Sequence, residues 1–251
     1  MLTRLVSVAA AAVIALTFSG CGKSAGSNGE AASPAAGQES TDTGGASSDL
    51  DDFNEAMTQT ASGNESYHFV MSTNTAGFKM KGEGDFGPGP VMQMTLGTPL
   101  GKTKMIVIGK QAYMRMPTLG NSWFKMPIDL ANQQQTGSNP DAYSELFKKS
   151  GAVTLVGSED VDGVSAKHYH VVIPAAELKK SGVVDKGAAD ILKGDLIYDI
   201  WVDGDKHPVK LSNQLEVSGT NTTLVMKFSN FGEPVSVQAP PASQVKDFPK
   251  P

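Results

Sequence analysis

The chain has one cysteine, Cys21, among its 251 residues, so no internal disulfide can form. A chain without disulfides depends on a hydrophobic core, and the roughly 200 residues that follow the leader and stalk described below suffice for one such domain. Basic residues are in the minority: 21 Lys and Arg face 26 Asp and Glu, for a formal net charge of −5. This balance argues against nucleic acid as a partner, because phosphate binding requires a basic surface. For the same reason we do not expect electrostatic adhesion to anionic lipid.

Motifs of catalysis are also absent. The sequence contains no G-x-S-x-G elbow, no Walker A loop, no H-E-x-x-H and no C-x-x-C. Gly163–Lys167 resembles a nucleophile turn, but it lacks the second glycine and falls in an expected hairpin. We therefore expect a protein that is not an enzyme and that uses neither a cofactor nor a metal.

Two short patterns could be taken for metal ligands. His168 and His170 are two residues apart, so they share one face of a strand, where two imidazoles could bind a metal. The sequence places no third ligand beside them, and a half-exposed strand tolerates histidine, so the structural interpretation is favoured. Asp160–Gly163 and Asp203–Asp205 resemble parts of calcium loops but lack the twelve-residue pattern with its terminal Glu, and we interpret them as turns.

Residues 1–21 have the pattern of a secretory leader that ends at a modified cysteine. Arg4 precedes an uncharged, mostly apolar run, Leu5–Phe18, and Ser19-Gly20 stands directly before Cys21. The run is too short to span about 30 Å of hydrocarbon but suits a signal peptide. Its end resembles a lipobox, although Phe18 stands where Leu is usual. An ordinary signal peptide with an incidental cysteine is the alternative. We predict a lipoprotein signal peptide over 1–20 and an acylated Cys21 as the anchor on the extracytoplasmic face of the plasma membrane.

The next segment has the composition of a tether. Residues 22–48 contain no Leu, Ile, Val, Met or aromatic residue, so they cannot bury enough apolar surface to offset the entropy of ordering. Their Gly, Ser and Ala content predicts a flexible stalk over 21–48, with a root-mean-square reach of about 30 Å. The folded domain is then expected over 49–251.

Hydrophobic periodicity predicts an α+β domain. Leu50, Phe53 and Met57 recur at helical spacing, with Ser48 as a candidate cap and Gly63 as a stop. Further helices are expected over 139–150 and, in two pieces, over 174–193. Alternating segments predict about ten strands, the clearest being residues 67–73, 104–108, 111–116, 123–126, 153–161, 166–173, 196–202, 209–217 and 222–228. Most strands follow one another without a crossover helix, so the sheet should be antiparallel.

Methionine is concentrated in one part of the chain. Eight of the eleven methionines fall between Met71 and Met126. Because methionine is flexible and polarizable, a sheet face that it lines could form the wall of a cavity for acyl chains, although it could also simply fill core gaps. The candidate lining residues, all on one predicted strand face, are Phe69, Met71, Phe78, Met80, Met92, Met94, Met105 and Met114.

The later half carries a more specific pattern, made of Val161–Val171, Tyr198–Asp203, His207–Lys210, Met226–Val237 and Pro240. This pattern resembles actinobacterial lipoproteins of the LppX/LprG/LprA type and, more distantly, LolA-like carriers and the sensor domain of RseB-type regulators. The resemblance covers most of residues 50–248. It implies a strongly curved antiparallel sheet, a half-barrel, with helices packed on its concave face and an apolar cavity between them. It gives no catalytic motif to transfer.

Two functions remain open at this point. The first is a membrane-anchored lipoprotein that binds lipid or lipoglycan acyl chains in an apolar cavity and carries them across the cell envelope, a function that the resemblance implies. The second is an envelope sensor or protein-interaction module with the same fold and no lipid cargo. A large cavity favours the first, and a collapsed core with an exposed apolar patch favours the second. The sequence identifies no protein partner.

Overall fold

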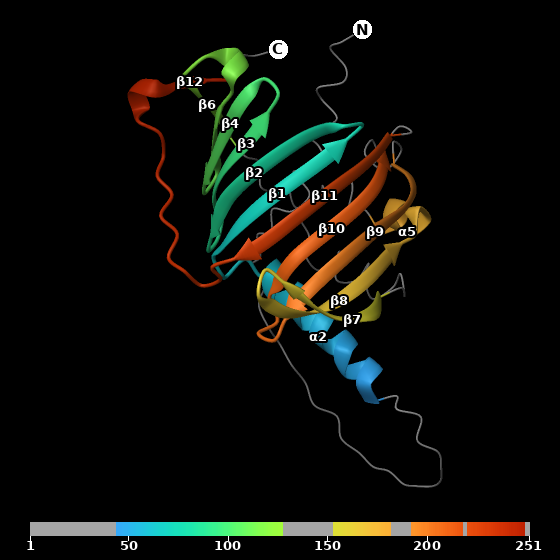
Figure 1. Ribbon diagram of the computed structural model, residues 1–251. Helices are drawn as coiled ribbons and strands as arrows, with labels where there is room; N and C mark the ends of the chain where they lie inside the picture. Colours follow the sequence, from blue (N-terminus) through green and yellow to red (C-terminus); the bar gives the residue numbers. More distant parts are fainter. Residues whose placement is uncertain (1–43, 128–152, 182–191, 218–219, 249–251) are drawn as a thin grey trace, which may run out of the picture.

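The computed structural model describes residues 44–127, 153–181, 192–217 and 220–248 (Figure 1). Cys21, the leader, most of the expected stalk and the expected helix at 139–150 lie outside these residues. The described part is mostly β, with one twelve-stranded sheet and few helices. The strands are β1 Tyr67–Thr75, β2 Phe78–Gly87, β3 Val91–Thr98, β4 Gly101–Ile108, β5 Gln111–Arg115, β6 Trp123–Pro127, β7 Val153–Val161, β8 Val164–Ile173, β9 Leu192–Asp203, β10 Pro208–Val217, β11 Thr220–Ser229 and β12 Val245–Asp247.

The sheet follows the chain with one rearrangement. Its strand order is β12-β6-β5-β4-β3-β2-β1-β11-β10-β9-β8-β7, so β1 pairs with β2 on one side and with β11 on the other. All neighbouring strands are antiparallel except β12, which runs parallel to β6. The expected antiparallel sheet is therefore confirmed, with two more strands than the approximate count of ten.

Tight turns join neighbouring strands, and the one at Asp160–Gly163 lies where the sequence predicts it. Asp162 and Gly163 join β7 to β8 with φ of 54° and 89°, the left-handed conformations that a two-residue hairpin turn requires. Gly109, with φ of 58°, begins the turn between β4 and β5. Ala76 and Gly77 join β1 to β2 and also have positive φ.

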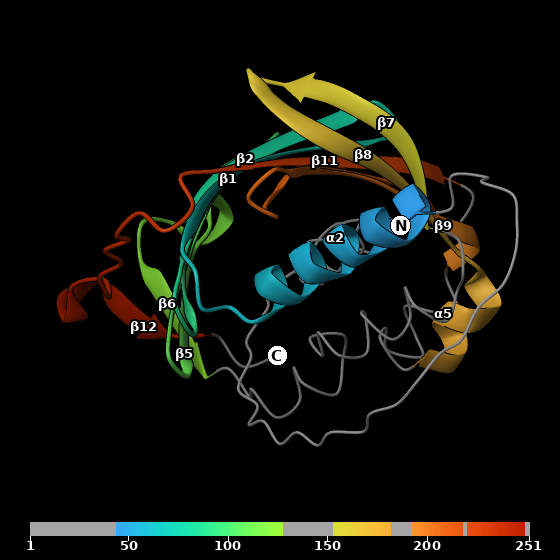
Figure 2. The same cartoon turned by 90° about the horizontal axis from the view of Figure 1, so that it is seen from below.

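Helix α2, Gly44–Ala61, lies along one face of the sheet (Figure 2). Phe53 and Ala56 are completely buried, at the helical spacing expected for the side that faces a sheet. The helix begins four residues before Ser48, so the prediction that Ser48 caps it is wrong. It ends at Ala61, and Gly63 follows with φ of 60°, as the stop signal predicts.

The remaining helical elements are short. Helix α5, Ala175–Ser181, forms the first piece of the helix expected over 174–193, and β9 already begins at Leu192. Two 3-10 turns, η2 (Pro117–Leu119) and η3 (Ala242–Gln244), precede β6 and β12. Among the described residues, none of the helices has the length and apolar character needed to cross a membrane.

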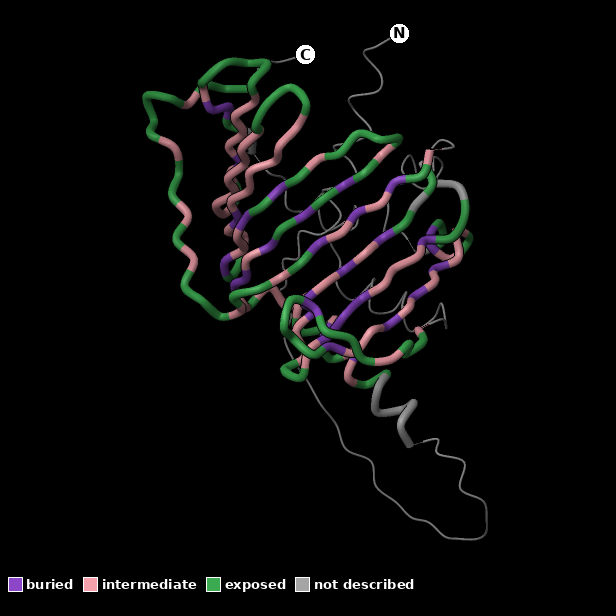
Figure 3. The backbone as a smooth tube through the Cα atoms, viewed as in Figure 1, coloured by how far each residue is buried: buried purple, intermediate pink, exposed green. Residues whose placement is uncertain are grey.

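Burial alternates along the central strands (Figure 3). In β1, Tyr67, Phe69, Met71 and Thr73 are buried, while most of the residues between them are exposed. Directly paired residues in an antiparallel sheet project to the same face, so the register extends this assignment from strand to strand. We call the face on which α2 packs the helix-side face, and the other the outer face.

Candidate functional site

The register brings the predicted lining residues onto one face of the β1–β6 half. Phe69 lies opposite Gly84, which lies opposite Met94. Met94 then pairs with Met105, and Met105 with Met114. Met71 and Met92 lie on the same face, two residues from Phe69 and Met94, and Met80 lies on it four residues from Gly84. All eight candidates, including Phe78 at the end of β2, therefore share the face to which Phe69 projects.

Burial differs among these eight residues. Phe69, Met71 and Met92 are buried, with exposed fractions of 2%, 3% and 4%. Met80, Met94, Met105 and Met114 are only partly buried. Phe78, at the tip of the β1–β2 hairpin, is 68% exposed. The candidates therefore range from packed residues on β1 and β3 to partly buried ones on β2–β5 and an exposed one at the end of β2.

Two glycines explain why the β1 side chains are packed. A Cβ on Gly84 would lie 2.2 Å from the backbone oxygen of Gln93 and 2.8 Å from Phe69 Cε1. A Cβ on Gly82 would lie 2.9 Å from Met71 Cγ. The Phe69 and Met71 side chains thus lie over the bare backbone of β2 and form a cluster with Tyr67, Leu224 and Met226.

Helix α2 packs on the β7–β10 half of the sheet. Phe53 packs against Tyr169 with ring centroids 5.2 Å apart, and both side chains are fully buried. Val171, Ile173 and Ile200 are buried in the same cluster. Of the described helices, α2 packs on β7 and β10 and α5 on β9, and neither packs comparably on β3–β5. The partly buried methionines therefore lie beside, not beneath, the described helices.

An ion-paired network fastens α2 to the sheet. Lys167 Nζ lies 2.8 Å from Asp52 Oδ2, and Lys206 contacts the other carboxylate oxygen. Hydrogen bonds from these two lysines hold the pKa of Asp52 below its ordinary value. The carboxylate is thus an anchor of the helix and is already occupied by partners.

His168 and His170 share the outer face, as their spacing predicts, and both are bound to carboxylates. Asp199 Oδ1 lies 3.0 Å from His168 Nε2 and 2.9 Å from His170 Nδ1. His168 Nδ1 lies 3.0 Å from Glu159, which also accepts a hydrogen bond from the Trp201 indole. Burial alone would raise the pKa of Asp199, but the hydrogen bonds of His170 and His168 outweigh it and lower that pKa. The two imidazoles therefore belong to a hydrogen-bonded ladder that accounts for them without a metal.

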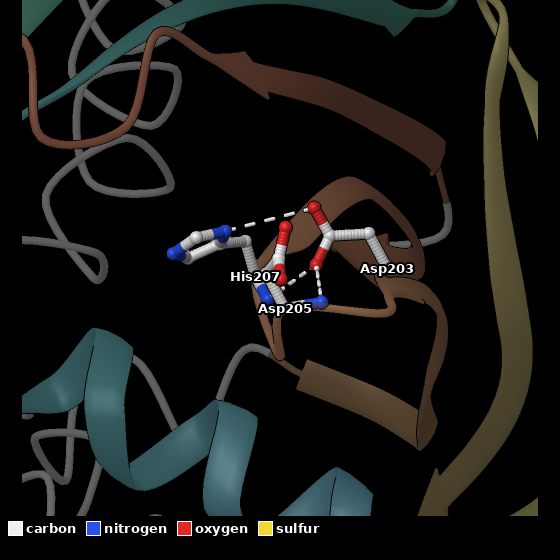
Figure 4. Close-up of side chains that lie close together, drawn as sticks. All are labelled: Asp203, Asp205 and His207. Carbon is white, nitrogen blue, oxygen red and sulfur yellow. Dashed lines mark hydrogen bonds and ion pairs between the residues drawn. The ribbon is translucent and has the colours of Figure 1, made fainter.

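Asp203, Asp205 and His207 converge at the turn between β9 and β10 (Figure 4). Their ligand-type atoms lie within 4.8 Å of one another. However, Asp203 Oδ1 accepts hydrogen bonds from the backbone N–H groups of Asp205 and His207, at 3.0 and 2.8 Å. The His207 ring stacks on Phe231 at 4.2 Å, and its Nε2 lies 3.2 Å from Glu65. The expected turn is confirmed, and the Asp203 carboxylate stabilises it by accepting these two backbone hydrogen bonds.

A polar hollow on the outer face was not expected from the sequence. It has a volume of about 170 Å³ and is lined by His68, Asp85 and Gln93 together with Asn230 and residues 233–236. Asp85 accepts from Gln93 Nε2 and contacts His68 Nδ1, both at 2.8 Å. These three residues pair directly across β1, β2 and β3. Only the register brings them together, so no local signal in the sequence could have identified them.

The chain was compared with known proteins. No family model matches it. It is 30% identical over 129 residues to an uncharacterized 31.2 kDa protein of the rplA-rplJ intergenic region of Streptomyces griseus, a match that spans 48% of this chain and 42% of that protein. The Mycobacterium tuberculosis lipoprotein LppX matches in structure with a TM-score of 0.54, 17% identity, and coverage of 78% of this chain and all of that one. LprF from Mycobacterium bovis matches with a TM-score of 0.53 and 17% identity, and the match covers 79% of this chain and 98% of that one. The expected likeness is thus confirmed: the chain has the fold of the lipoproteins LppX and LprF.

Proposed function

We propose that this protein is an extracytoplasmic lipoprotein, anchored through acylated Cys21, that binds lipid or lipoglycan acyl chains in an apolar cavity and carries them across the cell envelope. In this proposal residues 1–20 are the signal peptide, 21–48 the stalk and 49–251 the binding domain. The sheet is curved into a half-barrel whose concave side is the helix-side face. The cavity lies over β1–β5, with the eight residues Phe69, Met71, Phe78, Met80, Met92, Met94, Met105 and Met114 as its wall.

The observation that carries the proposal is the uneven cover of one apolar face. Under α2 the face is sealed, with Tyr169 and Val171 at 0% exposure. Over β3–β5 the same face presents Met94, Met105 and Met114, which are only partly buried. An apolar face that its own described helices leave partly open suits an apolar ligand, because each methylene removed from water contributes about 0.8 kcal/mol. The fold shared with LppX and LprF supports the same use.

Opposed substitutions on one strand test the proposal. Met105 and Ile106 are neighbours on β4 and project to opposite faces, and both are partly buried. Met105→Gln should weaken binding of a fluorescent acyl probe about tenfold, because it puts an amide on the ligand wall, whereas Ile106→Gln should leave it within about twofold. Probe titration of both variants, with thermal unfolding as a check on folding, measures the difference. Equal affinities for the two folded variants would contradict the assignment of this face.

One feature favours the second function, a protein-interaction module. Strand β7 is the last strand of the sheet, and its apolar residues Leu155 and Val156 are 37% and 57% exposed. An edge of this kind can accept a strand from another protein. Failure of probe uptake by the unmodified protein would leave this function as the better supported of the two.

A further inference from the structure

Three turns at one end of the β1–β6 half present large apolar side chains to solvent. Phe78 in the β1–β2 hairpin is 68% exposed, Leu100 between β3 and β4 is 65% exposed, and Leu119 in η2 is 40% exposed. Phe78 and Leu100 both lie three positions beyond the Lys81–Gly97 pair. Leu100 and Leu119 both lie four positions beyond the Lys104–Arg115 pair. The three turns therefore lie at the same end of the sheet, and neighbouring turns are two strand spacings, about 10 Å, apart.

The same tips are basic, and one acid, Glu83, lies in the register row of Lys104 and Arg115. Residues 74–82, 97–104 and 115–122 include no Asp or Glu, and their cations are Lys79, Lys81, Lys102, Lys104 and Arg115. We call these five cations, with Phe78, Leu100 and Leu119, the tip patch. In the part of the chain that the structure describes, its four lysines make no ion pair. Three lysines elsewhere in the chain are ion-paired: Lys167 and Lys206 with Asp52, and Lys227 with Asp162.

The location of this charge alters the expectation drawn from the net charge. The chain carries −5 overall, but attraction between exposed charges decays within about 8 Å at physiological salt. A surface approaching the tips therefore meets five positive charges against one nearby negative charge, Glu83, and not the acidic total. The electrostatic argument against adhesion to anionic lipid does not hold at these three turns.

We propose that the tip patch docks on the surface of an anionic lipid bilayer, with Phe78, Leu100 and Leu119 inserted among the headgroups. Exposed aliphatic and aromatic side chains interleaved with unpaired lysines are the chemistry of an interfacial contact. An acidic protein would be matched by the lysines but would leave the apolar tips exposed. Docking goes beyond cargo binding, because it needs neither the Cys21 anchor nor a filled cavity. It would place Met80, on the helix-side face next to Phe78, close to the membrane.

The test uses the chain without residues 1–21, which is not acylated and retains every described residue. It is mixed with vesicles of phosphatidylcholine containing 30% phosphatidylglycerol, and with vesicles of phosphatidylcholine alone, and bound protein is measured by flotation. We expect binding to the anionic vesicles that falls steeply as salt is raised, and at least tenfold weaker binding to the neutral ones. Equal binding to both, or no binding to the anionic vesicles at low salt, would overturn the proposal.

Matched variants separate the tip patch from the rest of the surface. Lys102→Glu should reduce vesicle binding about fivefold or more, while Lys110→Glu, the same charge change in the turn at the opposite end of β4, should have little effect. Phe78→Ser should reduce it about tenfold, while Val156→Ser, an exposed apolar change on β7, should not. Equal losses in a variant and its control would overturn the assignment. Probe uptake should be unchanged in Lys102→Glu, so failure of docking and failure of cargo binding give different results.

Discussion

The two halves of the sheet differ although they belong to one continuous structure. In the β7–β10 half, α2 buries Phe53 against Tyr169, and an ion-paired Asp52 ties the helix to β8 and to the turn after β9. In the β1–β6 half, the corresponding face carries several partly buried methionines. In the part of the chain that the structure describes, the turns at one end of these strands carry lysines without an ion pair. The first half is packed as a core, and the described residues of the second half are packed less completely. Function is therefore best sought where packing is least complete.

The largest expected effect contrasts the two halves directly. Phe53→Ala should lower the free energy of unfolding by about 3–5 kcal/mol, because it removes a fully buried ring. Met105→Ala should cost no more than about 1–2 kcal/mol, because its side chain is only partly buried. Urea unfolding of both variants gives the comparison. If Met105→Ala costs as much as Phe53→Ala, the β1–β6 half is packed as tightly as the other and the contrast disappears.

A smaller effect is expected in β2, beneath the Phe69 side chain. Gly84→Ala should destabilise the fold by about 1–3 kcal/mol, because its Cβ would meet the Gln93 backbone and the Phe69 ring at 2.2 and 2.8 Å. Gly204→Ala is the matched control, since a Cβ there meets nothing within 4 Å. Thermal unfolding of the two variants measures the difference. A Gly84→Ala protein as stable as the control would mean that Phe69 is free to move away from β2.

The sequence predicts the elements better than their pairing. Asp162-Gly163 fixes a hairpin through local backbone preference, and the period of two in β1 fixes which residues are buried. Strand β12 could not be predicted, because its three residues are too few to show a hydrophobic period. They pair with β6, more than a hundred positions away in the sequence. The polar hollow and the tip patch depend on register and on local charge. Neither composition nor net charge contains that information, so both had to come from the structure.

The smallest expected effect concerns the α2 anchor and depends on pH. Asp52→Asn should lower the free energy of unfolding by about 1 kcal/mol near pH 6, because two lysines lose a charged partner. The pKa of Asp52 is lowered in the folded state, so the stabilisation is present above the ordinary carboxyl pKa and is lost as pH falls through the folded value. Urea unfolding at pH 6 and at pH 3 should show the difference between wild type and variant shrinking in acid. Asp51→Asn, an exposed neighbour, is the control. A constant difference at both pH values would rule out this pairing as its source.

The most direct test of lipid binding is native mass spectrometry of the full chain, produced with its leader in an actinobacterial host and released in detergent. Our account predicts a non-covalent mass of an acyl lipid on the folded protein, lost on organic extraction, in addition to any covalent acyl mass that persists in the denatured spectrum. A folded protein with no such added mass, which also fails to take up the acyl probe, would contradict it.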